Sequence, residues 1–193
     1  MSLLIAGLVV FLGIHSIRIF AEGGRQALIG RLGASGFKGL YTVVSLAGFA
    51  LIVYGYGEAR MTTSLVWNPP VATRHLAALL TLVAFVFLAA SYVPGNRIKR
   101  AVAHPMVIGV KVWAFAHLLS NGTVADIVLF GSFMVWAALD FRAARARDRN
   151  ADIKPATEAS LSRDFLVVGA GVIGWLVFAL WLHGWLIGIK PFG

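Results

Sequence analysis

Long apolar runs, separated by short polar stretches, recur along almost the whole of this 193-residue chain. A helix needs about 20 apolar residues to cross a hydrocarbon core of about 30 Å. The pattern predicts an all-α, integral membrane six-helix bundle, with a single transmembrane domain over residues 1–193. The predicted spans are Ser2–Phe20, Gly39–Tyr56, Leu76–Val93, Pro105–Ser120, Val124–Phe141 and Phe165–Ile189.

The polar stretches between these runs are too short to form another domain. Arg142–Asp164 carries alternating charge and Pro155, which favours a solvated cytoplasmic connector that extends the fifth helix by a turn or two. Gln26–Leu32 is expected to lie in the membrane interface as a short amphipathic helix. The first run has neither a basic start nor an A-x-A cleavage site, so we expect it to stay on the mature chain.

The composition fits a membrane protein rather than a soluble one. Only 13% of the residues are charged and 59% are hydrophobic, whereas about 25% of a soluble domain is charged. A water-soluble enzyme and a nucleic-acid-binding domain are therefore excluded as first interpretations. The chain has no cysteine, so disulfides, thiolate nucleophiles and Cys-ligated metals are excluded as well.

Lysine and arginine are distributed unequally between alternate loops. Thirteen of the 17 fall on one side, Arg60, Arg74 and Lys190 fall on the other, and Lys111 lies within a span. Because short cytoplasmic loops carry the excess of basic residues, we expect a multi-pass protein of the bacterial inner membrane with both termini periplasmic. The net charge of +9 then reports orientation among lipids and implies no nucleic-acid partner.

Two histidines stand out, because a polar side chain at membrane depth is costly unless a partner or cofactor satisfies it. His75, His104 and His183 lie at span ends, where an imidazole reaches water or headgroups. His15 and His117 are instead flanked on both sides by apolar turns. Facing helices of a bundle often hold haem iron through two histidines, although a hydrogen-bonded structural role stays open for each.

Two charged residues lie near His117. If the fourth and fifth spans form a hairpin about residues 121–122, Asp126 lies at the depth of His117 and would orient its ring; the alternative is a helix N-terminal charge. Lys111 shares a helix face with His104. It suits a haem propionate or an anionic substrate, or else snorkels toward the cytoplasmic side.

Depth argues against pairing His15 with His117. At 1.5 Å per residue, the depths of the two residues in the membrane differ by roughly 10 Å. Such a difference disfavours binding of one iron by both histidines. Helix tilt can absorb such a difference. The depth-matched pairs, His15 with His104 and His75 with His117, stay open.

Five motifs together resemble the NnrU family over nearly the whole chain. They are Phe11-Leu12-Gly13-Ile14-His15-Ser16-Ile17-Arg18, Lys38-Gly39-Leu40-Tyr41, Arg74-His75-Leu76-Ala77, His104-Pro105-Met106 and Lys111-x-Trp113-Ala114-x-Ala116-His117-Leu118-Leu119-x-Asn121-Gly122. The resemblance implies a role near denitrification, either in redox or sensing chemistry of nitrogen oxides or in the maturation machinery of nitrite and nitric oxide reductases.

The plant relatives of that family, zeta-carotene cis-trans isomerases, bind haem b through histidines. This resemblance implies haem b here, with His15 and His117 as iron ligands. Asp126 would then orient the His117 ring, and the candidate propionate contacts are Lys111, His104 and Arg18.

The isomerases carry a cysteine three residues before the second histidine, where this chain has Ala114. That departure removes the ligand exchange through which the isomerases work. A haem isomerase acting on an apolar polyene and a cofactor-free membrane assembly factor remain as alternatives. In the second case the polar residues only fix helix packing.

Two further motifs carry less weight. Gly169-Ala170-Gly171-Val172-Ile173-Gly174 matches a dinucleotide fingerprint but lacks the preceding strand, which favours close helix packing and leaves a homo-oligomer open. His104-Pro105-x-x-x-Gly109 is similar to a turn of membrane isoprenylcysteine and phospholipid methyltransferases, with Ala103 in place of their arginine.

Overall fold

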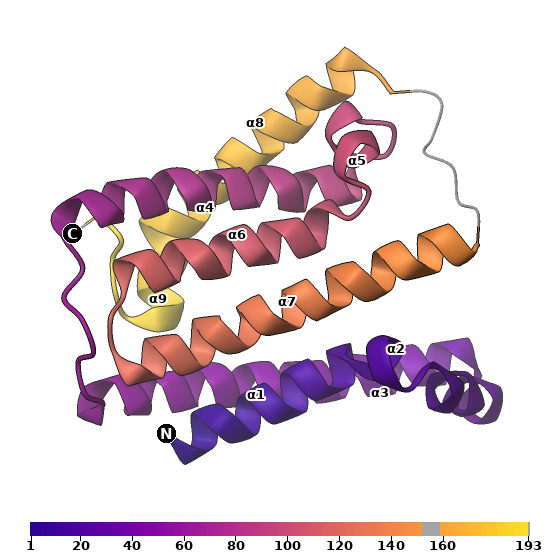
Figure 1. The fold of residues 1–193 in the computed structure, drawn as a ribbon, viewed down its shortest axis with the longest axis horizontal. Helices are drawn as coiled ribbons and strands as arrows, with labels where there is room; N and C mark the ends of the chain where they lie inside the picture. The colour runs from indigo at the N-terminus through magenta and orange to yellow at the C-terminus, as the bar shows by residue number, and fades with distance from the viewer. Residues whose placement is uncertain (152–158, 193) are drawn as a thin grey trace.

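The computed structural model describes residues 1–151 and 159–192, and these fold into helices (Figure 1). They contain no strand, only an isolated antiparallel bridge between Leu65 and Thr123 in two connecting loops. The all-α prediction is therefore confirmed. The helices are α1 (Ser2–His15), α2 (Ile17–Phe20), α3 (Glu22–Thr62), α4 (Val71–Tyr92), α5 (Arg97–Val102), α6 (Pro105–Ser120), α7 (Val124–Asn150), α8 (Leu161–Val177), the π-helical turn η1 (Phe178–Leu182) and α9 (His183–Ile187).

Within the part of the chain that the structure describes, four helical segments are long and apolar enough to cross a membrane. They are α3, α4, α7 and the continuous segment Leu161–Ile187, in agreement with the predicted membrane class. The apolar helices α1 and α6 have 14 and 16 residues, which correspond to about 21 and 24 Å. Length alone therefore supports four of the six predicted spans.

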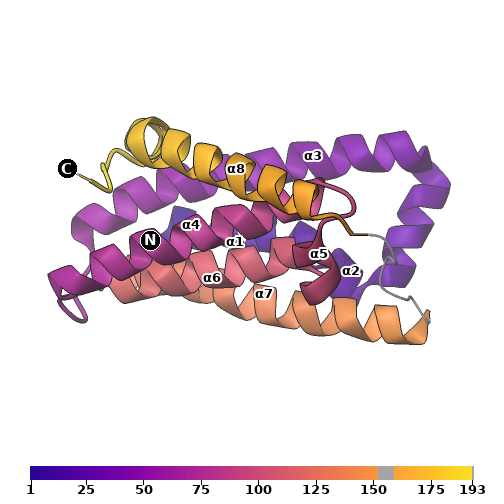
Figure 2. The same cartoon turned by 90° about the horizontal axis from the view of Figure 1, so that it is seen from above.

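The first two predicted spans have different boundaries in the structure. α1 ends at His15, and a turn at Ser16 separates it from α2. α3 begins at Glu22 rather than Gly39 and is kinked at Gly33, which has φ 72° and ψ 165°. Glycine takes this backbone conformation without the steric cost of a side chain. The predicted interfacial helix Gln26–Leu32 is thus part of an arm, residues 22–32, that meets the rest of α3 at an angle (Figure 2).

The fourth predicted span agrees with α6, and the fifth helix extends into the connector, as predicted. Pro105 starts α6, where a missing backbone N–H costs nothing. α7 continues past Phe141 to Asn150 and carries Arg147 and Arg149 in its last turn, where basic side chains interact favourably with the helix dipole. Residues 152–158 of the predicted connector lie outside the described residues.

The helices form two groups on either side of α7. α1 packs along α3 in one group, α4 packs on α6 and α8 in the other, and α7 contacts members of both (Figure 1). Both termini lie at the same end of the bundle, together with the α3–α4 and α6–α7 connections.

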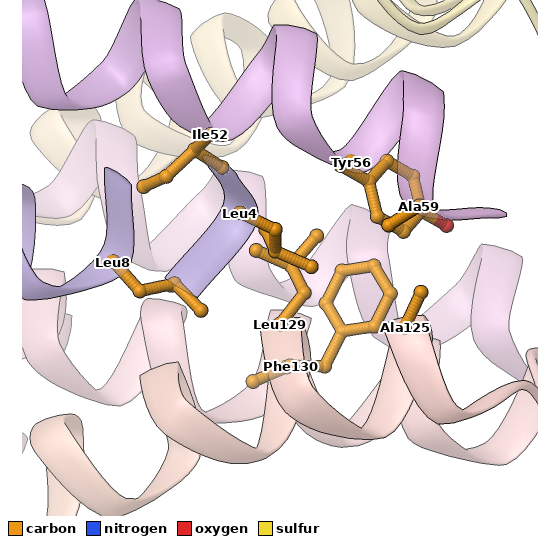
Figure 3. Close-up of a cluster of buried hydrophobic side chains, with 9 residues drawn as sticks. Leu4, Leu8, Ile52, Tyr56, Ala59, Ala125, Leu129 and Phe130 are labelled. Carbon is orange, nitrogen blue, oxygen red and sulfur yellow. The ribbon is translucent and has the colours of Figure 1, made fainter. Parts of the chain in front are cut away.

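A cluster of buried apolar side chains lies where α1, α3, α6 and α7 meet (Figure 3). Its members are Leu4, Leu8, Ile52, Tyr56, Ala59, Ala114, Ala125, Leu129 and Phe130. Glycines allow close helix approach around it and elsewhere. A Cβ at Gly171 of α8 would lie 2.8 Å from Val86 Cα of α4, so the packing interpretation of the Gly169–Gly174 motif is confirmed at its middle glycine.

Candidate functional site

His117, on the last turn of α6, has a fixed ring orientation. Its Nδ1 lies 2.9 Å from the carbonyl oxygen of Trp113, one turn earlier. A carbonyl oxygen only accepts, so Nδ1 carries the proton and Nε2 is left with a free lone pair. The rings of Phe130 and Trp113 lie against the imidazole, with centroids 4.5 and 5.1 Å away. This is the anchored geometry of metal-binding histidines.

His117 lines a cavity of about 410 Å³ between α4, α6, α8 and the C-terminal segment. Its lining includes five aromatic side chains together with polar and charged residues, the aromatic ones being Phe85, Trp113, Trp175, Phe178 and Phe192. Such a cavity suits a mainly apolar ligand that a few polar groups orient.

His183 lines the same cavity from the start of α9. Its Nδ1 lies 2.7 Å from the carbonyl oxygen of Ile189, so its Nε2 is free by the same argument. No hydrogen bond within the described residues involves Nε2 of His117 or His183. From its place at the end of the sixth span, His183 was predicted to be an interfacial residue. Its position at the outer end of the sixth span, close to the depth of His117, was the available signal.

Arg74 and Lys190 also line this cavity. Within residues 1–151 and 159–192, neither forms an ion pair. From the sequence, both were predicted only to report orientation. Two cations beside an apolar cavity favour a ligand that carries anionic groups.

His15 has the same anchoring in a different place. Its Nδ1 lies 2.7 Å from the Phe11 carbonyl oxygen, and its ring stacks on Phe11 with centroids 4.2 Å apart. Tyr41 of α3 and Trp136 of α7 lie at 5.1 and 6.1 Å. His15 therefore belongs to the α1–α3 group and does not line the cavity at His117.

The structure does not bring His15 and His117 together. A chain of ring contacts links them: Phe11 lies 5.8 Å from Phe133, and Phe133 lies 5.4 Å from Trp113. Their respective neighbours on α7, residues 136 and 130, are six positions apart, about 9 Å along the helix. This separation agrees with the difference in depth that the sequence predicts.

The predicted pairing of Asp126 with His117 is not formed. The Asp126 carboxylate is buried and accepts hydrogen bonds from the Tyr56 hydroxyl at 2.6 Å and from Thr123 N and Oγ1 at 2.8 and 2.7 Å. Together with Thr123, Asp126 completes a capping box at the start of α7. The alternative interpretation, a helix N-terminal charge, is therefore the correct one.

The three predicted propionate contacts also lie away from this cavity. His104 Nε2 is 2.7 Å from an Asp148 carboxylate oxygen, and Lys111 Nζ lies 5.8 Å from the centre of the Phe141 ring. The backbone carbonyl of Arg18 accepts a hydrogen bond from Arg147. The position of Lys111 agrees with snorkelling. His75 is exposed, and its neighbour Arg74 lines the cavity instead.

The comparisons with known proteins yield a family and no individual relative. No curated protein and no solved structure matches the chain. A family model described as NnrU protein matches residues 3–191. The match spans nearly the entire chain, and this membrane protein therefore belongs to the NnrU family.

Proposed function

We propose that this protein binds haem b in the membrane, with His117 as an axial ligand of the iron. The observation that carries this proposal is the His117 side chain, which is anchored at Nδ1, has a free Nε2 and lines a cavity with five aromatic side chains. In line with the family, the bound haem would serve redox or sensing chemistry of nitrogen oxides, or the maturation of their reductases.

The residues at the cavity fit haem in three respects. An aromatic lining suits the macrocycle, an imidazole with a fixed tautomer suits the iron, and cations suit the propionates. When bound, haem supplies a one-electron couple and a site for small ligands.

His15 remains the second ligand that the resemblance implies, and it has the same anchored Nδ1 as His117. Against it stands the chain of rings through Phe11, Phe133 and Trp113 that separates the two imidazoles. A haem between them would require these rings to move.

The proposal includes the topology. Six segments cross the inner membrane of a bacterium, with both termini periplasmic. Two observations support it: both termini lie at one end of the bundle (Figure 1), and α1 and α6 are apolar helices although they are short. A short apolar helix can be accommodated by local thinning of the bilayer.

A visible absorption spectrum of detergent-purified protein, expressed with ample haem, tests the proposal. We expect a Soret band in the wild type and its loss or a large change in His117→Ala. His75→Ala is the matched control, because His75 is exposed and does not line the cavity. His15→Ala and His104→Ala separate the other ligand assignments. Colourless wild-type protein that also takes up no added haem would contradict the proposal.

A second candidate function is cis-trans isomerisation of a polyene, which the five aromatic side chains of the cavity favour. Its test is conversion of a cis-carotene by the reduced protein. Absence of turnover in a preparation that carries its full complement of haem would count against it. A cofactor-free assembly role would instead predict a colourless protein whose loss still impairs reductase maturation.

A further inference from the structure

Two histidines, His117 and His183, line one cavity. Each has its Nδ1 held by a backbone carbonyl, at 2.9 and 2.7 Å, and each is left with a free Nε2. Five aromatic side chains also line this cavity. Two histidines on different helices that line one cavity beside aromatic side chains form a donor set suited to a six-coordinate haem.

The π-helical turn η1 directs His183 into this cavity. Phe178 and His183 are five residues apart, yet both line the cavity, and their ring centroids lie 5.8 Å apart. In an α-helix with 3.6 residues per turn, positions five apart point in clearly different directions. The wider π turn brings them nearly into line, and such turns are frequent at functional sites.

The chain reversal after α9 completes the arrangement. Gly188 adopts the left-handed conformation with φ 77° and ψ 11°, which glycine takes without steric cost. The reversal returns the Ile189 carbonyl oxygen to His183 Nδ1 and brings Lys190 to the cavity wall. Arg74, at the start of α4, lines the same cavity.

We propose that His183, and not His15, is the second axial ligand, and that Arg74 and Lys190 bind the two carboxylates of the porphyrin. This inference rests on the proposed function, since it names the partners of the haem that His117 binds. Each cation lacks an ion-pair partner within the described residues. A dianionic ligand can therefore pair with both cations without breaking an existing ion pair.

The first test is the spin state of the haem in full-length protein in detergent. We expect a low-spin six-coordinate spectrum in the wild type and in His15→Ala. His183→Ala should give a high-spin five-coordinate spectrum with haem still bound, and added imidazole should restore the low-spin form. His183→Gln is the second variant, since its side-chain amide can still donate to the Ile189 carbonyl without replacing an imidazole as ligand. A low-spin His183→Gln together with a high-spin His15→Ala would overturn the proposal.

Ala114 provides an independent check of which side of α6 faces the haem. Its side chain is fully buried in the cluster of α1, α3, α6 and α7, and it does not line the cavity. We expect Ala114→Cys to retain the imidazole-type spectrum of the isosteric control Ala114→Ser. A thiolate-type shift of the Soret band would place the haem on the His15 side and contradict the assignment of His183.

Metal-free protoporphyrin IX tests the two cations without involving axial ligation. Trp113 and Trp175 line the cavity, so quenching of tryptophan fluorescence reports binding. We expect the wild type to bind protoporphyrin IX better than its dimethyl ester, and we expect Arg74→Gln/Lys190→Gln to bind the diacid about threefold to tenfold more weakly. Arg31→Gln, an exposed cation on the arm of residues 22–32, is the control. Equal affinity of the double variant and the wild type would contradict the roles of Arg74 and Lys190.

The two tests separate the two proposals. A wild-type protein without haem affinity contradicts the proposed function. Haem binding that is unchanged by substitution of His183 and of both cations contradicts only this inference.

Discussion

At the scale of single residues, hydrogen bonds to the backbone decide what the polar side chains can do. Three histidines, His15, His117 and His183, have Nδ1 within 2.7–2.9 Å of a carbonyl oxygen. Each imidazole therefore has the tautomer in which Nε2 binds a metal or accepts a proton. The Asp126 carboxylate instead accepts its hydrogen bonds from Tyr56 and Thr123, so it stabilises the fold. His117 is oriented by its hydrogen bond to the Trp113 carbonyl oxygen.

Asp126→Asn is expected to destabilise the protein by about 1–3 kcal/mol, because a buried carboxylate that accepts three hydrogen bonds is replaced by an amide. Thr123→Ala should cost about 1 kcal/mol through the lost helix cap. Unfolding in detergent, followed by circular dichroism, measures both effects. Glu22→Gln is the control, since its ion pair with Arg25 is largely exposed and contributes at most about 1 kcal/mol. If Asp126→Asn leaves the stability unchanged but alters the haem spectrum, the result would contradict this structural role and support the predicted pairing of Asp126 with His117.

At the scale of helices, small residues set the distance between packed elements. A Cβ at Gly55 of α3 would overlap the backbone nitrogen of Leu4 in α1. A Cβ at Gly48 would lie 2.7 Å from Phe11 N, and one at Gly7 would lie 2.6 Å from Ile52 N. These contacts join backbone to backbone, so a larger side chain cannot be accommodated by a rotamer change. Without a hydrophobic force between helices in lipid, such close packing is a main source of their association.

Gly55→Ala and Gly57→Ala form a matched pair within α3. Gly55→Ala should destabilise the protein by about 1–3 kcal/mol, since the added methyl forces α1 away from α3. A Cβ at Gly57 meets nothing within 4 Å, so Gly57→Ala should be neutral or stabilising by up to about 1 kcal/mol through helix propensity. Unfolding in detergent measures both. Equal effects of the two substitutions would show that α1 does not pack on α3 as described.

At the scale of the whole molecule, the two ends of the bundle differ in charge and in content. The end that holds the termini and the α3–α4 and α6–α7 connections (Figure 1) also holds the cavity with Arg74 and Lys190. The opposite end holds α5 and the end of α7, where most of the basic residues gather. In the proposed topology, which follows the positive-inside rule, the cavity would lie in the periplasmic half of the membrane.

Single cysteines in this cysteine-free chain test the orientation without background labelling. Val66, in the α3–α4 connection, and Arg149, near the end of α7, are both exposed. We expect a membrane-impermeant maleimide to label Val66→Cys in intact cells and Arg149→Cys only after permeabilisation. The reverse result would contradict the periplasmic position of the termini.

The class of the protein follows from the sequence alone, because the cost of placing a side chain in hydrocarbon depends mainly on its own chemistry. The apolar runs, the low charge and the unequal distribution of cations therefore predict helices, membrane and orientation. The α6 boundaries follow from Pro105 and the hairpin residues, and they agree with the structure. The kink at Gly33 was not predicted, since a single glycine within a polar stretch has several possible conformations.

The partners of the polar groups were decided only by the tertiary structure. Tyr56 meets Asp126 across 70 positions of sequence, and no local pattern encodes that contact. One cavity is lined by His183, Arg74, Lys190 and His117. This arrangement depends on how α4, α6 and α8 pack, on the π turn at η1 and on the reversal at Gly188. Hydropathy fixes the depth of a residue in the membrane, whereas packing fixes the direction in which its side chain points, and a binding site requires both.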